Sequence, residues 1–143
     1  KGMVERCRQN ARLSGVPEDG IRYIVDDCKK FVLREIKRGK KYNAVLMDPP
    51  SYGRGPSGEM WKLEDSLYEL ATLVREVLDR PLFYLINSYT TGLQPTVIKN
   101  ILSLVMHGEK GSADAYELTL PVSDKSMGET ELPCGCSGLW TKK

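Results

Sequence analysis

The segment Asp48-Pro49-Pro50-Ser51-Tyr52 contains the residues of this sequence that are best suited to chemistry. Two consecutive prolines stiffen the backbone and donate no hydrogen bonds, so the Asp48 carboxylate and the neighbouring carbonyl oxygens are presented at fixed positions. The Tyr52 ring could stack on a flat base while its hydroxyl bonds water or a partner. These groups suit a planar ligand that carries hydrogen-bond donors. The alternative is a rigid structural corner, in which Asp48 caps local amides and Tyr52 packs on the core.

Polar side chains also follow two other predicted strands. Asp26 and Asp27 come directly after a short β-branched run, and Asn87 and Ser88 come after a later apolar run. In α/β proteins, ligands bind beyond the carboxyl ends of parallel strands. Together with Asp48, the sequence therefore predicts three strand ends that direct hydrogen-bonding groups to one edge of a sheet.

Helices and strands must alternate along the chain to bring these ends together. The apolar spacing predicts helices over residues 4–13, 31–36, 67–78 and 95–106, with Gly39 ending the second and Pro81 the third. Strands are expected at residues 21–25, 43–47 and 82–86, and then as a pair within residues 113–140 that turns near residues 127–128. Residues 51–58 contain three glycines and one proline, which indicates a loop.

This alternation predicts an α/β fold of three layers, with a mostly parallel sheet and a closing antiparallel pair. The run at residues 43–47 is apolar without polar alternation, which is typical of a strand buried on both faces, so we expect it at the centre of the sheet. No repeat or linker divides the sequence. A single domain over residues 1–143 is therefore expected.

The composition is that of an ordinary globular protein. Among 143 residues, 41% are hydrophobic, and 21 Lys and Arg stand against 19 Asp and Glu. No run approaches the roughly 18 apolar residues of a membrane-spanning helix, and a net charge of +2 does not by itself indicate nucleic acid. The four cysteines have neither zinc-site spacing nor the density of a disulfide scaffold. We therefore expect reduced thiols and a cytoplasmic location.

The Asp48 segment, preceded by Ala-Val-Leu-Met and followed by Gly-Arg-Gly-Pro-Ser-Gly-Glu-Met-Trp-Lys, resembles the fourth motif of class I S-adenosylmethionine-dependent methyltransferases. The similarity is greatest to the bacterial branch that resembles ribosomal RNA methyltransferases. It implies a Rossmann-like fold and S-adenosylmethionine as cofactor. It also implies that Asp27 accepts a hydrogen bond from the adenine amine, with the Cys28 backbone facing the ring. Helix capping is the structural alternative for Asp27, and Asp26 is a further candidate contact whose alternative is a solvated or structural role.

The resemblance implies catalytic roles for Asp48, Pro49, Pro50 and Tyr52, with Asp48 also bordering the methionine end of the cofactor. The carboxylate and a proline carbonyl would accept hydrogen bonds from a target amine, and Tyr52 would stack on the base. Because the sulfonium methyl is already activated, alignment of the acceptor suffices, and neither a metal nor a covalent intermediate is needed. A thiolate route is not expected, because Cys134 and Cys136 fall in the closing hairpin.

The resemblance also makes RNA, with ribosomal RNA foremost, the expected substrate and partner, and a base nitrogen the expected acceptor. Arg54, Trp61 and Lys62 could close over a nucleotide. The basic run between Lys29 and Lys41 could add affinity, but a solvated helix face is the preferred interpretation. The alternative function is a non-catalytic binding or assembly module.

One departure from the family is large. The glycine-rich cofactor turn and the first two strands are missing, and Gly53, Gly55 and Gly58 only imitate the turn, because they follow Asp-Pro-Pro and enclose Pro56. We therefore expect a carboxyl-terminal part that alone is inactive and binds the cofactor weakly or not at all. The strands at residues 21–25 and 44–47 would keep unpaired edges, which either close together or pair with a second copy.

Overall fold

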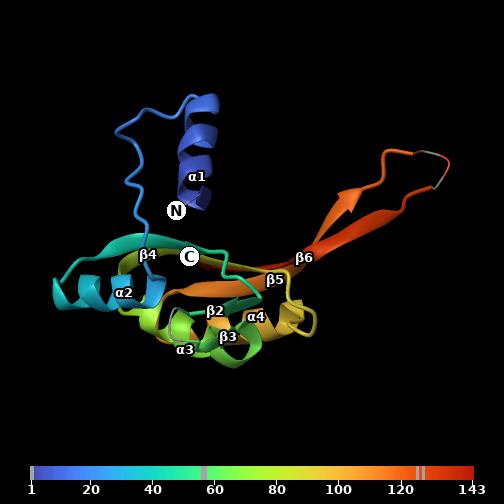
Figure 1. The fold of residues 1–143 in the computed structure, drawn as a ribbon. Helices are drawn as coiled ribbons and strands as arrows, with labels where there is room; N and C mark the ends of the chain where they lie inside the picture. Colours follow the sequence, from blue (N-terminus) through green and yellow to red (C-terminus); the bar gives the residue numbers. More distant parts are fainter. Residues whose placement is uncertain (1, 56–57, 125, 127) are drawn as a thin grey trace.

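The computed structural model describes residues 2–55, 58–124, 126 and 128–143. Its main sheet has four strands in the order β1 (Tyr42–Met47), β4 (Leu78–Ser88), β6 (Glu131–Lys142) and β5 (Gly111–Pro121) (Figure 1). β1 and β4 are parallel, whereas β6 runs antiparallel to both β4 and β5. One of these three pairings is parallel and two are antiparallel, so the sheet is mixed and the expected mostly parallel sheet is found only in part. The reason is that the closing hairpin places β6, and not β5, beside β4.

Three helices cover one face of this sheet, namely α2 (Cys28–Lys37), α3 (Leu63–Arg75) and α4 (Pro95–Val105) (Figure 1). α1 (Gly2–Leu13) lies on the opposite side and apart from the strands, and it contains no buried residue. The expected third layer thus consists, within the described residues, of one helix that does not pack on the sheet. No helix in the described part of the chain is long and apolar enough to cross a membrane.

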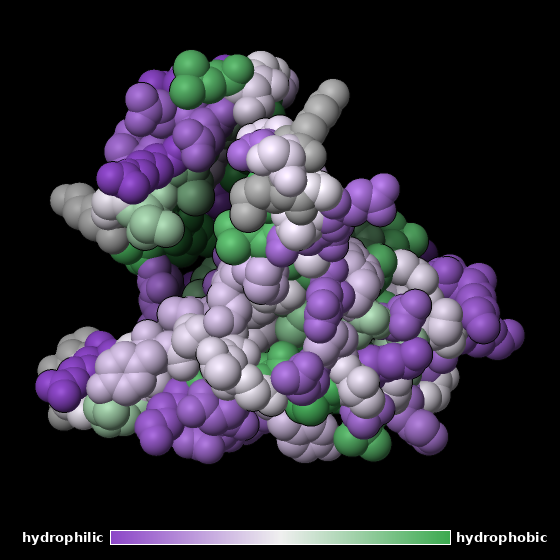
Figure 2. Space-filling model, turned by 90° about the vertical axis from the view of Figure 1, so that its right-hand side faces the viewer, coloured by the Kyte–Doolittle hydropathy of each residue, from purple (hydrophilic) through white to green (hydrophobic). Residues whose placement is uncertain are grey.

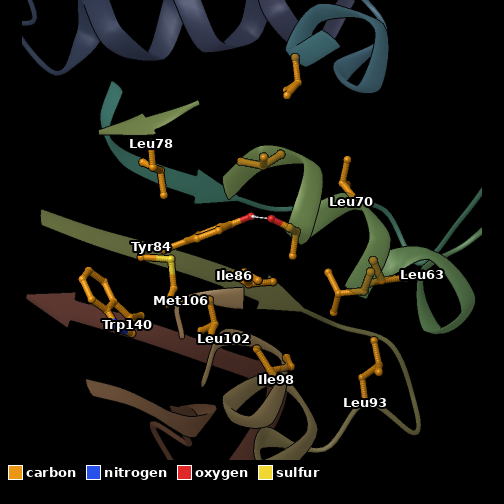
Figure 3. Packing of buried hydrophobic residues seen from close by; sticks show 14 of the residues in the cluster. Leu63, Leu70, Leu78, Tyr84, Ile86, Leu93, Ile98, Leu102, Met106 and Trp140 are labelled. Atoms are coloured by element: carbon orange, nitrogen blue, oxygen red, sulfur yellow. Dashed lines mark hydrogen bonds between the residues drawn. The ribbon is translucent and has the colours of Figure 1, made fainter. Parts of the chain in front are cut away.

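The core lies between the sheet and its covering helices. Tyr84 and Ile86 of β4 are fully buried in one cluster with side chains of α3 and α4, including Leu70 and Ile98 (Figure 3). The Tyr84 hydroxyl donates to the Ala71 carbonyl oxygen at 3.2 Å, and burial raises the pKa of this phenol. This face therefore carries most of the hydrophobic stabilisation.

The predicted helices are confirmed, with one corrected boundary. Leu67, Leu70, Ala71 and Val74 are buried along one side of α3. We expected Pro81 to end this helix, but it ends at Arg75, and Pro81 lies inside β4. The strand tolerates the proline because its pairing with β1 is interrupted there. Tyr42 pairs with Leu78, the register then shifts, and Ala44 pairs with Phe83.

Two strand predictions need correction. Residues 21–25 form no strand, because no neighbouring segment within the described residues pairs with them. The run at residues 43–47 is a strand, as predicted, but β1 lies at an edge of the sheet and not at its centre. Leu46 is accordingly 71% exposed. A β-branched or apolar run becomes a central strand only when partners lie on both sides.

The closing antiparallel pair is confirmed as β5 and β6. β4 pairs with β6 only as far as Ser88 and Cys136, while the β5–β6 ladder continues to Pro121 and Glu131. The hairpin therefore projects from the body as a two-stranded arm (Figure 1). Of the predicted turn, Gly128 has a positive φ of 69°, whereas Met127 lies outside the described residues.

The glycine-rich segment is not only a loop. Within it and just beyond it, β2 (Tyr52–Arg54) pairs antiparallel with β3 (Met60–Lys62). Pro56, and Ser57 beside it, lie outside the described residues. The β2–β3 hairpin follows the Asp48 segment directly and leads without a gap into α3. It thus connects the end of β1 to the packed core.

Candidate functional site

Asp48 lies directly beyond the end of β1, as predicted. Its side chain is exposed, and within the described residues its carboxylate has no hydrogen-bond or ion-pair partner. It therefore caps no amide there, in contrast to the structural alternative. An exposed carboxylate without a partner is free to accept hydrogen bonds from a ligand.

The backbone after Asp48 is held firmly, in contrast to the free side chain. The indole nitrogen of Trp61 donates to the Pro50 carbonyl oxygen at 2.8 Å, and the Leu63 amide donates to the Ser51 carbonyl oxygen at 3.0 Å. The Thr90 hydroxyl, from the segment after β4, donates to Ser51 Oγ at 2.7 Å. Residues 61–63 thus hold the backbone after Asp48, and Thr90 holds the Ser51 side chain.

Tyr52 begins the β2–β3 hairpin and is 51% exposed. Its hydroxyl donates to the Met60 sulfur across the hairpin at 3.0 Å. The expected alternative of a tyrosine packed on the core is therefore not found. The exposed ring and thioether together form a flat, polarisable surface beside the Asp48 segment, and such a surface suits stacking with an aromatic ring.

The third strand end is tied into the fold. Ser88 is 1% exposed, and its hydroxyl oxygen accepts from the Thr90 amide at 3.2 Å. Asn87 Oδ1 accepts from the Ser137 hydroxyl at 2.5 Å, across the β4–β6 ladder. These two residues position the Thr90 segment, so their role within the described residues is structural.

The two acidic side chains at residues 26–27 bond to nearby residues of α2. Asp26 forms an ion pair with Arg34 of α2. Asp27 is the N-cap of α2, because its Oδ1 accepts from the Lys30 amide at 2.8 Å. Asp27 Oδ2 has no partner within the described residues. The capping alternative is thus present in the structure, and it leaves one carboxylate oxygen available.

An open groove of about 470 Å³ separates the extended residues 22–26 from β1. Asp26 and Cys28, on either side of Asp27, line one wall, and Met47, directly before Asp48, lies on the other. The groove therefore reaches the neighbourhood of both acidic ends. Its floor is apolar and comes from α2, β1 and the end of α3, with Phe31, Val45 and Val74 among the lining residues.

Figure 2 shows α1 as a separate projection from the body of the molecule.

A polar pair that sequence reasoning missed links α2 to β1 in this groove region. Glu35 is 5% exposed, and its two oxygens accept from the Tyr42 hydroxyl at 2.5 Å and from Arg38 at 3.1 Å. The Tyr42 bond and the Arg38 guanidinium lower the pKa of Glu35, against the opposing effect of burial. The same bond, with burial, raises the pKa of Tyr42. The sequence signal for a buried Glu35 was its helical spacing from the apolar residues Phe31 and Val32.

The basic run is mostly engaged with acidic or backbone groups. Of its seven residues, four have such partners: Lys29 with Glu69, Arg34 with Asp26, Arg38 with Glu35, and Lys41 with the Glu76 carbonyl oxygen. These contacts favour the interpretation as a solvated helix face. The exposed pair of Lys29 with Glu69 contributes about 0–1 kcal/mol.

All four cysteines are free thiols, as expected. Cys136 is buried, donates to the Leu93 carbonyl oxygen at 3.2 Å, and has a pKa raised by burial and by Glu117. Cys134 lies nearby in β6 and is partly buried. A protonated, packed thiol is a poor nucleophile, so Cys136 does not form a reactive thiolate site.

Solved methyltransferases share this fold. The chain matches the SAM-dependent methyltransferase from Agrobacterium tumefaciens with a TM-score of 0.87 and 28% identity over 100% of its length. It matches SMU.776, assigned as a methyltransferase and solved with S-adenosylhomocysteine, with a TM-score of 0.70, 14% identity and 94% coverage. It matches the complex of M1.HpyAVI with S-adenosylmethionine with a TM-score of 0.53, 11% identity and 84% coverage. The chain therefore has a methyltransferase-like α/β fold.

The chain covers only part of the length of each of these solved proteins. The chain spans 47% of the Agrobacterium protein, 35% of SMU.776 and 54% of M1.HpyAVI. No protein-family model matches the sequence, and no curated protein does.

Proposed function

We propose that this chain belongs to a methyltransferase that transfers a methyl group from S-adenosylmethionine to a nitrogen of an RNA base. The proposal rests mainly on the Asp48 carboxylate, which has no partner within the described residues. The backbone after it is held by the Trp61–Pro50 hydrogen bond, and the half-exposed Tyr52 ring lies beside it. This arrangement suits an amine donor in a planar ring, since the carboxylate accepts its hydrogen bonds and the aromatic ring stacks on it. The similarity to SAM-dependent methyltransferases supports the reaction class.

The residues present fit part of the cofactor. Asp27 Oδ2 is left available by the cap, and one ionised carboxylate can accept more than one hydrogen bond. Asp27, Cys28 and Asp26 would thus hold the adenosine end, and Asp48 would border the methionine end. When bound, the cofactor supplies an activated methyl group. The residues of this chain would align the acceptor nitrogen and exclude water.

We propose further that two additional strands complete the sheet between residues 21–25 and β1. The groove separates these segments, residues 21–25 are unpaired within the described residues, and β1 has a partner only on its β4 side. A complete cofactor site would require these strands, because no glycine-rich turn in this sequence follows a strand and opens a helix. A second copy of the chain that enters the groove is the alternative occupant.

RNA is favoured as the substrate by two features near Tyr52. Arg54 and Lys62 are exposed on the β2–β3 hairpin, and neither forms an ion pair among the residues described. Free cations beside a stacking surface match the pairing of phosphate contacts with base contacts in RNA recognition. Ribosomal RNA is the first substrate to test, and the cytoplasm is the corresponding location.

A non-catalytic binding or assembly module is the second candidate. It is favoured by the missing glycine-rich turn and by the exposed edge of β1. The two functions differ in one measurable way, because only the enzyme consumes S-adenosylmethionine.

The test uses the protein encoded by the whole reading frame, incubated with S-adenosylmethionine labelled in its methyl group and with total cellular RNA. We expect the label to enter RNA and to be released when the RNA is digested with ribonuclease. Mass spectrometry of the nucleosides should then place the methyl group on a base nitrogen. Label found only in protein would refute the RNA substrate. No label in RNA, protein or small molecules would favour the non-catalytic module.

A further inference from the structure

The two prolines after Asp48 stiffen this segment but supply no amide hydrogen that could anchor it to the rest of the protein. Neither Pro49 nor Pro50 has an amide hydrogen, so only their carbonyl oxygens can be held by the rest of the protein. The Pro50 oxygen has one partner in the described residues, the indole N–H of Trp61 at 2.8 Å. The Pro49 oxygen has none there and stays available to a ligand.

Trp61 is well placed to hold this oxygen. It is the middle residue of β3 and pairs with Gly53 of β2, so the hairpin carries its side chain back toward the segment that precedes the hairpin. Its ring is partly buried and packs against the hydrophobic core. A ring held in this way has little rotamer freedom to lose when the hydrogen bond forms.

The next peptide group is held by the same part of the chain. The Leu63 amide donates to the Ser51 carbonyl oxygen at 3.0 Å, and Leu63 is fully buried at the start of α3. Residues 61–63 thus bind two consecutive carbonyl groups directly after Asp48 and Pro49. The Asp48 carboxylate and the Pro49 oxygen remain outside this set of bonds.

We infer that Trp61 is a positioning residue of the site, acting through the Pro50 carbonyl oxygen to fix the orientation of Asp48, Pro49 and Tyr52. Its contribution to catalysis rests on the proposed methyltransferase function. The bond itself does not, so the two can be tested separately. The β2–β3 hairpin then serves to bring a donor to two prolines that have no amide hydrogen of their own.

The first experiment measures amide hydrogen exchange by NMR on the 143-residue chain. Trp61→Phe removes the N–H donor and keeps an aromatic ring, and Trp140→Phe is the matched control, because Trp140 packs in the core beside Tyr84 and away from Leu63 (Figure 3). We expect Trp61→Phe to speed exchange of the Leu63 amide at least tenfold and to shift the Tyr52 amide resonance. Trp140→Phe should leave the Tyr52 resonance unchanged, and any faster Leu63 exchange that it causes should be matched by the other core amides, because a core cavity lowers global stability. Unchanged Leu63 and Tyr52 signals in Trp61→Phe would overturn the inference.

The second experiment measures methyl transfer by the whole-reading-frame protein with total cellular RNA as acceptor. A loss of orientation should lower kcat of Trp61→Phe by about 10- to 100-fold, since small misplacements of reacting groups have effects of that size. KM for S-adenosylmethionine should stay within twofold. An unchanged kcat in an active enzyme would overturn the positioning role. Absence of transfer in the unaltered protein would instead refute the proposed function, and hydrogen exchange alone would then decide whether Trp61 fixes the segment.

Discussion

The two acidic segments of this molecule, residues 26–27 and Asp48, differ in which of their groups form hydrogen bonds or ion pairs. At residues 26–27 the side chains are engaged, because Asp26 pairs with Arg34 and Asp27 caps α2. At Asp48 the side chain is free in the described structure, and the backbone beyond it is held through Pro50 and Ser51. A carboxylate that stabilises a helix is kept in place by that role. In the proposed site, the position of the Asp48 carboxylate therefore depends on the backbone that carries it.

This difference shows how each segment can be tested. Changes at Asp48 should alter chemistry and leave stability nearly unchanged, whereas changes at Asp27 should alter stability even where no cofactor binds. The pair formed by Glu35 and Tyr42 joins α2 to β1 at the opposite end of each element, near the last turn of α2 and at the first residue of β1.

The largest effect is expected for Asp48→Ala in the whole-reading-frame protein. Methyl transfer should fall by about 100-fold or more, because the target amine loses the group that orients it. The free energy of unfolding should change by no more than about 0.5 kcal/mol, because the side chain is exposed and without a partner in the described residues. Radiolabel transfer and urea unfolding measure the two quantities. Unchanged turnover would remove Asp48 from the mechanism.

The isolated 143-residue chain should bind S-adenosylmethionine weakly or not at all. The groove beside Asp26 and Cys28 is open, and the glycine-rich turn is missing. Isothermal titration calorimetry measures the affinity directly, with the whole-reading-frame protein as the positive control. A dissociation constant near 1 μM, equivalent to about 8 kcal/mol of binding free energy, would contradict this expectation.

Asp27→Ala should destabilise the chain by about 1 kcal/mol, the usual cost of losing an N-cap hydrogen bond. Asp27→Asn is the control, because asparagine caps helices about as well as aspartate. Urea unfolding followed by circular dichroism at neutral pH compares the two variants. Equal stability of Asp27→Ala and the unaltered chain would mean that the cap does not support the fold.

The smallest effect is expected from the link between α2 and β1. Since the folded-state pKa of Glu35 is lowered, its stabilising contribution is present above the unfolded-state pKa, about 4.3, and is lost as pH falls through the folded value. Tyr42→Phe removes the main cause of this shift. The variant should therefore lose less stability than the unaltered chain between about pH 5 and pH 3, as measured by thermal unfolding. Parallel curves would contradict the assignment.

The helices and the hairpin could be predicted because their signals are local. Leu67, Leu70, Ala71 and Val74 mark the buried side of α3, and Pro95 marks the start of α4. The position of Asp48 at a strand end and the cap at Asp27 also followed from neighbouring residues. Periodicity and capping depend on residues only a few positions apart, so one sequence suffices to find them.

The remaining errors concern contacts between distant segments. The run at residues 21–25 has strand composition, but strand formation needs a partner that the run does not specify. β2 and β3 span three residues each, which is too short to show alternation. The donor from Trp61 to Pro50 and the bond from Tyr42 to Glu35 depend on chain reversals, and no spacing in the sequence reveals them.

The open side of β1 has a practical consequence for the protein in the test tube. Its outward backbone groups, with Leu46 exposed beside them, offer a template on which strands from other molecules can add one after another. Concentrated solutions of the isolated chain should therefore aggregate on storage and form fibrils. Leu46→Lys would place a charge beside this edge and should slow the aggregation.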